Sequence, residues 1–284
     1  MSRTLLRALL IGLAAAMLAG LAFAQTPDEI RERGVIRIAT ANEIPYGWVD
    51  ENGVARGIAP ETAIAVLEDM GITNIEWIVT DFGSLIPGLI AGRFDIVAAS
   101  MAILPARCQQ VIYADVNSSY GEGLLVQEGN PNDIHSYQDF VDDPSLKFGL
   151  VSGADQIDFA HAMGIPDSQI VSIASNTDAL SAVATDRVDG YAATGLTVAR
   201  LAQEGEGVEA ADQFEDPVVD GTPVRSWGSF NFNQDATELR DAYNESLQAF
   251  QETQEWRDIL MSHGLSEADI ESTLNASTEE LCSE

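Results

Sequence analysis

The segment SMAILPARC at residues 100–108 places an arginine, Arg107, two residues after a proline at the end of an apolar run. The run predicts a buried strand, and Pro105 is typical of the first turn of a helix, where its missing N–H has no helical partner. A guanidinium presents a planar fork of donors that can bind a carboxylate bidentately, and the N–H groups of a helix start also favour an anion. Arg107 is therefore a candidate carboxylate-binding residue, with a surface ion pair as the alternative.

The chain as a whole is strongly acidic and holds few cations. Its 284 residues include 14 Lys+Arg and 45 Asp+Glu, which gives a formal net charge of -31, and Lys147 is the one lysine. Such an excess of carboxylates repels nucleic acid and anionic lipid, so we expect neither as a partner. The composition resembles that of proteins adapted to high salt, where ions screen the self-repulsion. An ordinary acidic protein is the alternative.

Residue types that usually carry catalysis or bind metals are sparse. The three histidines, His135, His161 and His263, lie outside the predicted cleft loops and fit surface or packing positions. No Ser-His-Asp or metal-ligand spacing appears, and no G-x-x-x-x-G-K-[ST] loop for a nucleotide is present. The sequence therefore predicts no catalytic residue, no metal and no cofactor.

Residues 1–24 predict a cleaved signal peptide. Two arginines precede an apolar run, and Ala22-Phe23-Ala24 forms a small-x-small cleavage site. We expect an exported, periplasmic protein whose mature chain starts at Gln25. An uncleaved membrane anchor is the alternative.

The chain has two cysteines, Cys108 and Cys282. In an oxidising compartment they can form a disulfide. Two free thiols are the alternative. The bond would tie the end of the chain to the helix that carries Arg107.

Strand and helix signals alternate along the first part of the chain and predict a mostly parallel sheet covered by helices. Asn52-Gly53 predicts a hairpin turn, and Ser84 is placed to cap a helix. The predicted strands lie at 35–40, 74–80 and 94–100, and the helices at 26–34, 60–71, 82–92 and after Pro105.

The pattern restarts near residue 121 and predicts a second unit of the same kind. Asn176 or Thr177 is expected to cap one of its helices. Strands are predicted at 121–128, 147–153, 169–174 and 188–194, and helices at 136–143, 155–164, 176–187 and 196–205. A returning strand is predicted at 224–233, followed by a long helical region at 236–264 that breaks near Thr253.

These elements predict an α/β protein of two lobes, with the second inserted into the first. We expect residues 25–122 and 223–284 to form lobe 1 and residues 123–222 to form lobe 2. The chain would cross between the lobes near 119–126 and 220–228. A ligand would lie between the lobes, at the carboxyl ends of the strands.

The order of several motifs resembles the family 3 solute-binding proteins of bacterial ABC importers: VIRIAT, PYGWVDENGVARGIAPETA, FGSLIPGLIAGRFDIVAAS, ILPAR and YNESLQAFQETQEW. The resemblance covers nearly the whole mature chain and implies the two-lobed type II periplasmic binding protein fold. Within the family, ATANEIPYGWVDENG, FGSLIPGLIAGRFDIVAAS and PARCQQV are most similar to ectoine- and hydroxyectoine-binding proteins.

The resemblance implies ligand contacts in lobe 1. Arg107, in an S-x-x-x-x-P-x-R arrangement that begins at Ser100, would bind the ligand carboxylate. Glu43 would pair with the N–H groups of a ring cation, and Tyr46 and Phe82 would form walls of an aromatic box, because ring faces suit a delocalised amidinium. The alternatives are a solvated loop acid for Glu43 and a core position for Phe82.

The third wall expected from the ectoine binders falls at Ala102, which has no ring. Either Tyr120, Trp227 or another ring replaces it, or the ligand is bulkier or is not ectoine. Trp48 fits a core or rim position better than a wall.

In lobe 2, Asp155 and Gln156 occupy a place where the family often has a hydroxyl residue that helps to hold the carboxylate. An aspartate would repel a carboxylate, so we expect Asp155 to face the cation, a ligand hydroxyl or solvent. Thr194 stands where amino-acid binders carry an aspartate for the α-ammonium. This departure argues against an ordinary α-amino acid and fits a ligand whose nitrogen is part of a ring.

The resemblance thus implies a monomeric periplasmic component of an ABC importer that closes its lobes on a small zwitterion and docks on a membrane permease. A binding protein for a polar amino acid is one alternative. A periplasmic dehydratase-like enzyme, with Glu43 or Asp155 as acid or base, is an alternative from another class. A receptor that presents its ligand to a chemosensor would share the same lobes.

Overall fold

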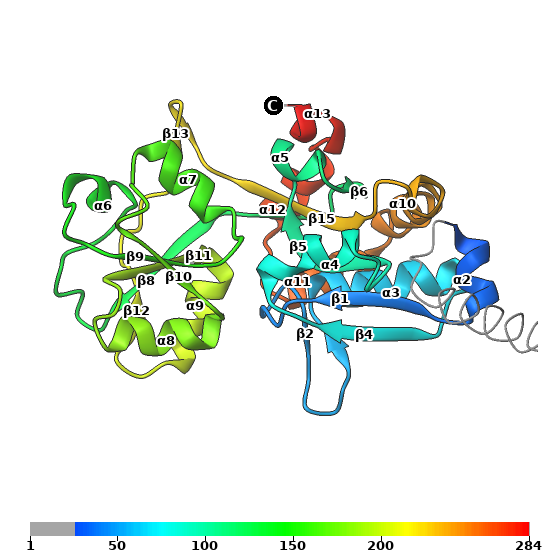
Figure 1. Cartoon of the computed structure of the whole chain (residues 1–284), viewed down its shortest axis with the longest axis horizontal. Helices are drawn as coiled ribbons and strands as arrows, with labels where there is room; N and C mark the ends of the chain where they lie inside the picture. The colour runs from blue at the N-terminus through cyan, green and yellow to red at the C-terminus, as the bar shows by residue number, and fades with distance from the viewer. Residues whose placement is uncertain (1–25, 284) are drawn as a thin grey trace, which may run out of the picture.

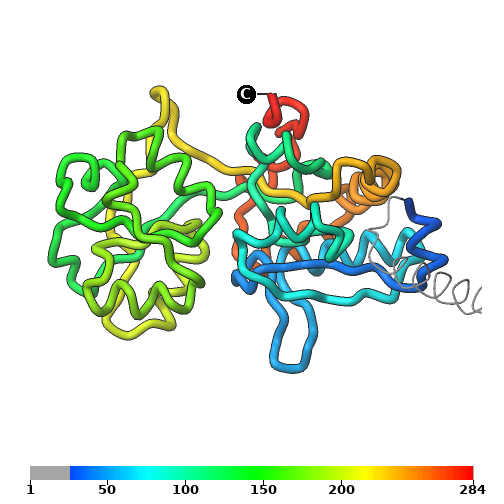
Figure 2. Tube along the Cα trace, in the orientation of Figure 1, coloured from blue at the N-terminus to red at the C-terminus, as the bar shows by residue number. Residues whose placement is uncertain are grey.

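The computed structural model describes residues 26–283, which form two α/β lobes joined by two extended connections (Figures 1 and 2). The predicted signal peptide at residues 1–24 lies outside the described residues. Between residues 26 and 283, none of the helices has both the length and the apolar character that crossing a bilayer requires.

The first lobe is built on a six-stranded sheet in the order β4-β1-β5-β15-β6, with β7 also paired to β15. β1 pairs in parallel with β4 and β5, whereas β15 runs antiparallel to its neighbours. Every residue of β5 is buried, which explains its continuous apolar run. The strands are β1 (Ile36–Thr40), β4 (Ile75–Val79), β5 (Ile96–Ala102), β6 (Ile112–Tyr113), β7 (Ser118–Tyr120) and β15 (Ser226–Phe232).

Helices pack on both faces of this sheet, because alternate residues of β5 point to opposite sides. Ile96 and Ala98 belong to the core beneath α3 and α10, whereas Val97 and Ala99 pack with α4. The helices of the first lobe are α2 (Pro27–Arg33), α3 (Ile58–Asp69), α4 (Leu85–Ile90), α5 (Pro105–Cys108), α10 (Thr237–Gln251), α11 (Gln254–Ser262), α12 (Glu267–Leu274) and α13 (Thr278–Ser283).

The second lobe is built on a five-stranded sheet in the order β10-β9-β11-β8-β12. β9 pairs in parallel with β10 and β11, and β8 runs antiparallel to β11 and β12. The strands are β8 (Glu122–Gln127), β9 (Phe148–Val151), β10 (Ile170–Ile173), β11 (Gly190–Thr194) and β12 (Val208–Ala210). The helices are α6 (Gln138–Asp142), α7 (Gln156–Met163), α8 (Asn176–Ala184) and α9 (Gly195–Glu204).

Two connections join the sheets. The chain leaves the first sheet after β7 and enters the second at Glu122, the first residue of β8. It returns after β12 through a small hairpin of β13 (Val218–Val219) and β14 (Thr222–Pro223) and re-enters the first sheet at β15. The predicted two-lobed fold with the second lobe inserted into the first is therefore confirmed.

Local signals in the sequence placed one turn and one helix break correctly. The Asn52-Gly53 turn joins β2 (Trp48–Val49) to β3 (Ala55–Arg56), and Gly53 has a positive φ of 78°. The long helical region breaks where predicted, since the Thr253 side chain accepts from the Trp256 N–H and caps α11.

Two predicted caps were wrong. Ser175 caps α8 by accepting from the Asp178 N–H, in place of Asn176 or Thr177. Ser84 stands before α4 but makes no capping hydrogen bond, because a 3-10 turn (Phe82–Ser84) leads into that helix.

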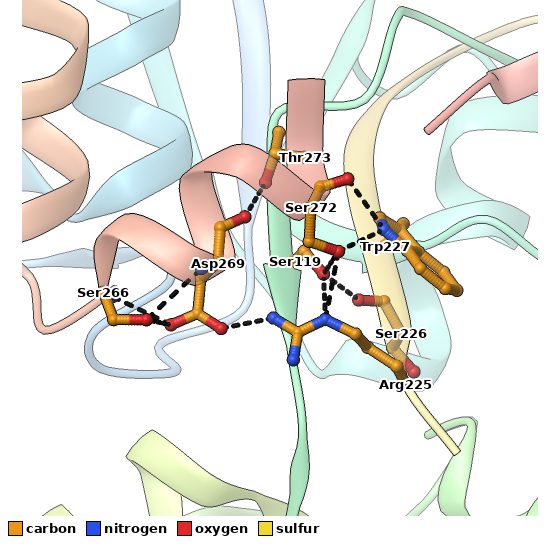
Figure 3. A network of polar contacts seen from close by, with 8 residues as sticks. All are labelled: Ser119, Arg225, Ser226, Trp227, Ser266, Asp269, Ser272 and Thr273. Carbon is orange, nitrogen blue, oxygen red and sulfur yellow. Dashed lines mark hydrogen bonds and ion pairs between the residues drawn. The ribbon is translucent and has the colours of Figure 1, made fainter. Parts of the chain in front are cut away.

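A polar network ties α12 to both strands at the edge of the first lobe (Figure 3). The Arg225 Nε donates to Ser119 Oγ of β7 at 2.6 Å and to Ser272 Oγ of α12 at 3.2 Å. Its Nη2 forms an ion pair with Asp269, and the Trp227 indole N–H donates to Ser272 Oγ at 3.1 Å. The network therefore fixes the first-lobe ends of both connections, and neither α12 nor its contacts were predicted from the sequence.

A disulfide joins Cys108 of α5 to Cys282 of α13, with 5.7 Å between the Cα atoms. Replacing both cysteines by serine should lower the free energy of unfolding by about 5 kcal/mol, because the bond closes a loop of 174 residues in the unfolded chain. Guanidinium unfolding of the oxidised protein and of the C108S/C282S variant measures this difference. An unchanged unfolding midpoint would contradict the expected contribution.

Candidate ligand-binding site

A small cavity lies between the two lobes, at the carboxyl ends of the parallel strands. The volume available to the centres of water molecules is about 30 Å³. The first lobe contributes Glu43, Tyr46, Phe82, Ala99, Ser100 and Tyr120 to its wall, and the second lobe contributes Ala154, Asp155, Gln156, Asn176, Tyr191 and Thr194 among others. Seven of the nine residues that the sequence nominated for ligand binding thus line one cavity, whereas Ala102 and Arg107 are not among its lining residues.

Aromatic rings line much of this cavity. Tyr46 and Tyr120 meet edge to face with 5.0 Å between ring centroids, and Phe82 contributes a third ring. Of the two rings named as replacements for the wall missing at Ala102, Tyr120 lines the cavity. Trp227 points elsewhere, to Ser272 (Figure 3).

Trp48, His135 and His161 lie outside the cavity, in the kinds of position expected for them. Trp48 lines a wider groove outside the cavity and meets His263 at 5.7 Å between centroids, which is a rim position. His135 and His161 form ion pairs with nearby aspartates, and the described residues around the cavity include no histidine.

Glu43 is held by a chain of hydroxyl groups that starts in the second lobe. Thr194 precedes α9, and its Oγ1 donates to Thr197 Oγ1 at 3.0 Å. Thr197 Oγ1 in turn donates to Glu43 Oε1 at 2.9 Å, which links the two lobes. Thr194 thus acts on Glu43 through Thr197. Nothing in the sequence distinguished Thr197 from the other threonines predicted to lie in helices.

Burial raises the pKa of Glu43 to about 7, and the nearby charge of Asp155 acts in the same direction. The hydrogen bond from Thr197 opposes this rise because it stabilises the ionised carboxylate. Close to neutral pH, Glu43 is therefore poised between its neutral and charged forms. A cationic ligand group would favour the charged form.

Asp155 and Gln156 stand side by side before and at the start of α7. Asp155 Oδ2 accepts from Ser226 Oγ of β15 at 2.8 Å, so this carboxylate also links the lobes. Gln156 Nε2 donates at 2.7 Å to Glu122, a buried acid that the sequence analysis did not nominate. The cavity wall therefore contains two carboxyl groups, Glu43 and Asp155, with a third directly behind it.

Arg107 lies on α5 with a buried side chain that reaches across the gap between the lobes. One Nη donates to the Ala102 carbonyl at 2.9 Å, and the other donates to the Gly153 carbonyl of the second lobe at 2.9 Å. Its guanidinium carbon lies 5.9 Å from the centroid of the Phe82 ring. These two bonds use two of the five N–H donors of the guanidinium.

Ser100 lines the cavity in an unusual backbone conformation. Its φ is 47° within a buried strand, and its Oγ has no hydrogen-bond partner among the described residues. Its carbonyl accepts from the Tyr120 hydroxyl at 2.9 Å. A Cβ at Gly228 would lie 2.2 Å from that carbonyl oxygen, so only glycine fits there. Such strain often marks a functional position, and the sequence gives no sign of it.

Asn176 and Tyr191 complete the second-lobe wall. The Tyr191 hydroxyl donates to Asn176 Oδ1 at 2.5 Å, which occupies the side chain that was expected to cap α8. Tyr191 lies in a buried strand and could not be distinguished from a core residue in the sequence.

Two α/β lobes with a cavity between them are the architecture of the two-lobed class of periplasmic binding proteins. The family model for bacterial extracellular solute-binding proteins, family 3, matches residues 36–265, and the chain belongs to this family. It is 49% identical over 267 residues to a probable amino-acid ABC transporter periplasmic-binding protein, y4tE, of Sinorhizobium fredii. That alignment covers 93% of this chain and 88% of the relative.

Solved structures show the same fold. The structure of EhuB in complex with hydroxyectoine is 28% identical, with a TM-score of 0.82, and the match covers 90% of this chain and 97% of EhuB. A solute receptor for L-cysteine of Neisseria gonorrhoeae is 20% identical with a TM-score of 0.73, and 84% and 94% of the two chains are covered.

Replacing Glu43 by glutamine should stabilise the protein as pH rises. The folded-state pKa of about 7 exceeds the ordinary value of 4.5, so wild-type stability falls between these two pH values. The E43Q variant should match the wild type below pH 4.5 and exceed it by about 2 kcal/mol above pH 7, a value discounted because Glu43 is only half-buried. Denaturant unfolding across this range measures the gap, with E51Q, an exposed acid of the same loop, as the control. A gap that does not change with pH would contradict the raised pKa.

Proposed function

We propose that this protein is the periplasmic solute-binding component of an ABC importer and that it binds ectoine, hydroxyectoine or a related small zwitterion. The observation that carries the proposal is the cavity between the lobes, whose wall contains Glu43 and the rings of Tyr46 and Phe82. The guanidinium carbon of Arg107 lies 5.9 Å from the centroid of the Phe82 ring. Carboxylate and ring faces suit a delocalised cation, and the guanidinium suits a carboxylate. The likeness to EhuB, whose structure holds hydroxyectoine, supports the choice of ligand.

Lobe closure would be the binding step, with the two connections as the hinge. Hydrogen bonds that join the lobes include those from Thr197 to Glu43, from Ser226 to Asp155, and from Arg107 to the Gly153 carbonyl. Gly83 also approaches the second lobe so closely that a Cβ there would lie 2.9 Å from the Ser152 oxygen. A ligand held in the cavity touches both lobes only when they are closed, and so it stabilises the closed state.

This role implies partner proteins and export of the chain. The closed protein, as a monomer, would dock on a membrane permease, and a separate chain would supply the ATPase. Residues 1–24 would direct export and then be removed. The acidic composition would suit a protein that works outside the cell's cytoplasm in high salt, where a compatible solute is needed.

A polar amino acid is the second candidate ligand, and the relative from Sinorhizobium fredii favours it. The carboxylate would again be held by Arg107, and Asp155 or Glu43 would take the ammonium group. Against this candidate, Thr194 offers a hydroxyl that is already engaged with Thr197. An enzyme on the same fold would use Glu43 or Asp155 as a base, and it would be recognised by conversion of the ligand.

Calorimetry in high salt should show ectoine or hydroxyectoine as the tightest ligand in a panel that includes glycine betaine, glutamine and arginine. Ligand recovered unchanged after long incubation supports a binding protein, and turnover would indicate the enzyme. Tight binding of glutamine or arginine with no response to ectoine would reject the proposed specificity.

Arg107→Ala should weaken binding of the tightest ligand by about 100-fold, because a charge-assisted pair to its carboxylate is lost. Arg107→Lys keeps the charge without the planar fork and should recover only part of the affinity. Titration of both variants, with circular dichroism to verify folding, tests this. Wild-type affinity in Arg107→Ala would exclude Arg107 as the carboxylate ligand.

A further inference from the structure

Glu122 is a buried acid directly behind the cavity wall. It is the first residue of β8, immediately after the first connection between the lobes, and it is 6% exposed. Its Oε2 accepts from Gln156 Nε2 at 2.7 Å and from the Tyr137 hydroxyl at 3.3 Å. Its Oε1 is buried and has no hydrogen-bond partner among the described residues. An ionised carboxylate in such a place is costly.

The charges around Glu122 make its ionisation more costly still. Within residues 26–283, no lysine, arginine or histidine forms an ion pair with it. Asp155, before α7, and Asp216, in the segment before the second connection, both act on it through their negative charges. Burial is the main cause that raises the pKa of Glu122 well above its usual range. The other titratable groups that face it are phenols of three tyrosines: Tyr46, Tyr120 and Tyr137.

Asp155 connects Glu122 to the cavity. It lines the cavity, it is 5% exposed, and its neighbour Gln156 holds Glu122 directly. Its hydrogen bond from Ser226 fixes it against β15, just after the second connection. A positive group placed beside Asp155 would offset the negative potential that Asp155 exerts on Glu122. A positive ligand charge therefore favours ionisation of both acids, although only Asp155 lines the cavity.

We propose that Glu122 is a proton-exchanging residue of the binding site, which carries a proton in the ligand-free protein and releases it to solvent when a cationic group binds beside Asp155. The O–H bond of the carboxylic acid breaks, the proton passes to the buffer, and the carboxylate stays hydrogen-bonded to Gln156. The proposal rests on the proposed function, because it needs a ligand with a cationic group. Glu122 does not contact the ligand. It acts on the ligand through Asp155, because its protonation state changes the negative charge behind the cavity wall.

The coupling between ligand binding and proton release determines whether ligand affinity rises or falls with pH. If binding releases a proton, affinity rises with pH, by about tenfold per pH unit where one full proton is released. Glu43 adds its own share of released protons near pH 7. The share of Glu122 is therefore the difference between the wild type and a variant that keeps Glu43.

The test is calorimetric titration with ectoine and hydroxyectoine at pH 7 in phosphate, Hepes and Tris buffers, whose ionisation enthalpies differ. The dependence of the observed enthalpy on buffer gives the number of protons released. Glu122→Gln should lower this number and flatten the rise of affinity with pH. The matched control is Glu128→Gln, an exposed acid just after the same strand, which should behave like the wild type.

A ligand-free measurement separates this proposal from the proposed function. Glu122→Gln should gain stability over the wild type as pH rises from 5 to 8, because the raised pKa destabilises the wild type over that range. If the ligands bind but the variant releases as many protons as the wild type, the proton proposal is wrong and the binding function stands. If no ligand in the panel binds, the binding function fails, and a constant stability gap would reject the proton-holding role of Glu122 independently.

Should Glu122→Gln fail to fold, Gln156→Met provides a second test. This change removes the amide donor that stabilises ionised Glu122. The midpoint of the pH profile of affinity should then move to higher pH, whatever the absolute affinity. A midpoint that stays in place would overturn the proposal.

Discussion

Burial of carboxyl groups between two lobes is the constraint on which the rest of this structure depends. Glu43, Asp155 and Glu122 lie in or directly behind one small cavity, and the guanidinium of Arg107 donates to backbone carbonyls instead of to any of them. Each carboxyl group is held by uncharged donors: hydroxyls of Thr197 and Ser226 and the amide of Gln156. Uncharged donors hold an acid in place without cancelling the charge of its ionised form, so ionisation of these groups is costly.

The same donors decide how the lobes meet. Thr197 and Ser226 each bond to an acid of the opposite lobe, and Arg107 bonds to a carbonyl from each lobe, so the contacts that shape the cavity are also those that join the lobes. On the first-lobe side, Arg225 and α12 fix both connections to one rigid body (Figure 3). Bending is therefore expected between this fixed edge and the second sheet, near Gly121 and in the hairpin of β13 and β14.

The sequence was informative wherever a signal is local. Strand and helix order, the Asn52-Gly53 turn and the break at Thr253 depend on neighbouring residues, and they were predicted well. Glu43 and Ser100 were nominated from the resemblance to solute-binding proteins, and the general place of the cavity was expected because the ends of parallel strands meet at one edge of a sheet. Thr197 could not, because it lies 154 residues from Glu43 and their contact depends on how two separate units are placed. The same holds for Glu122, which looks like one of many surface acids until its strand is placed in a sheet.

The position of β15 in the first sheet has a consequence for how the chain acquires its structure. β15 lies between β5 and β6, yet it comes from residues 226–232, after the whole second lobe has been made. The second sheet is formed by one continuous stretch of the chain and can assemble before β15 is available. The first sheet lacks its strand between β5 and β6 until β15 is available. The lobe that begins the chain is therefore the last to be completed.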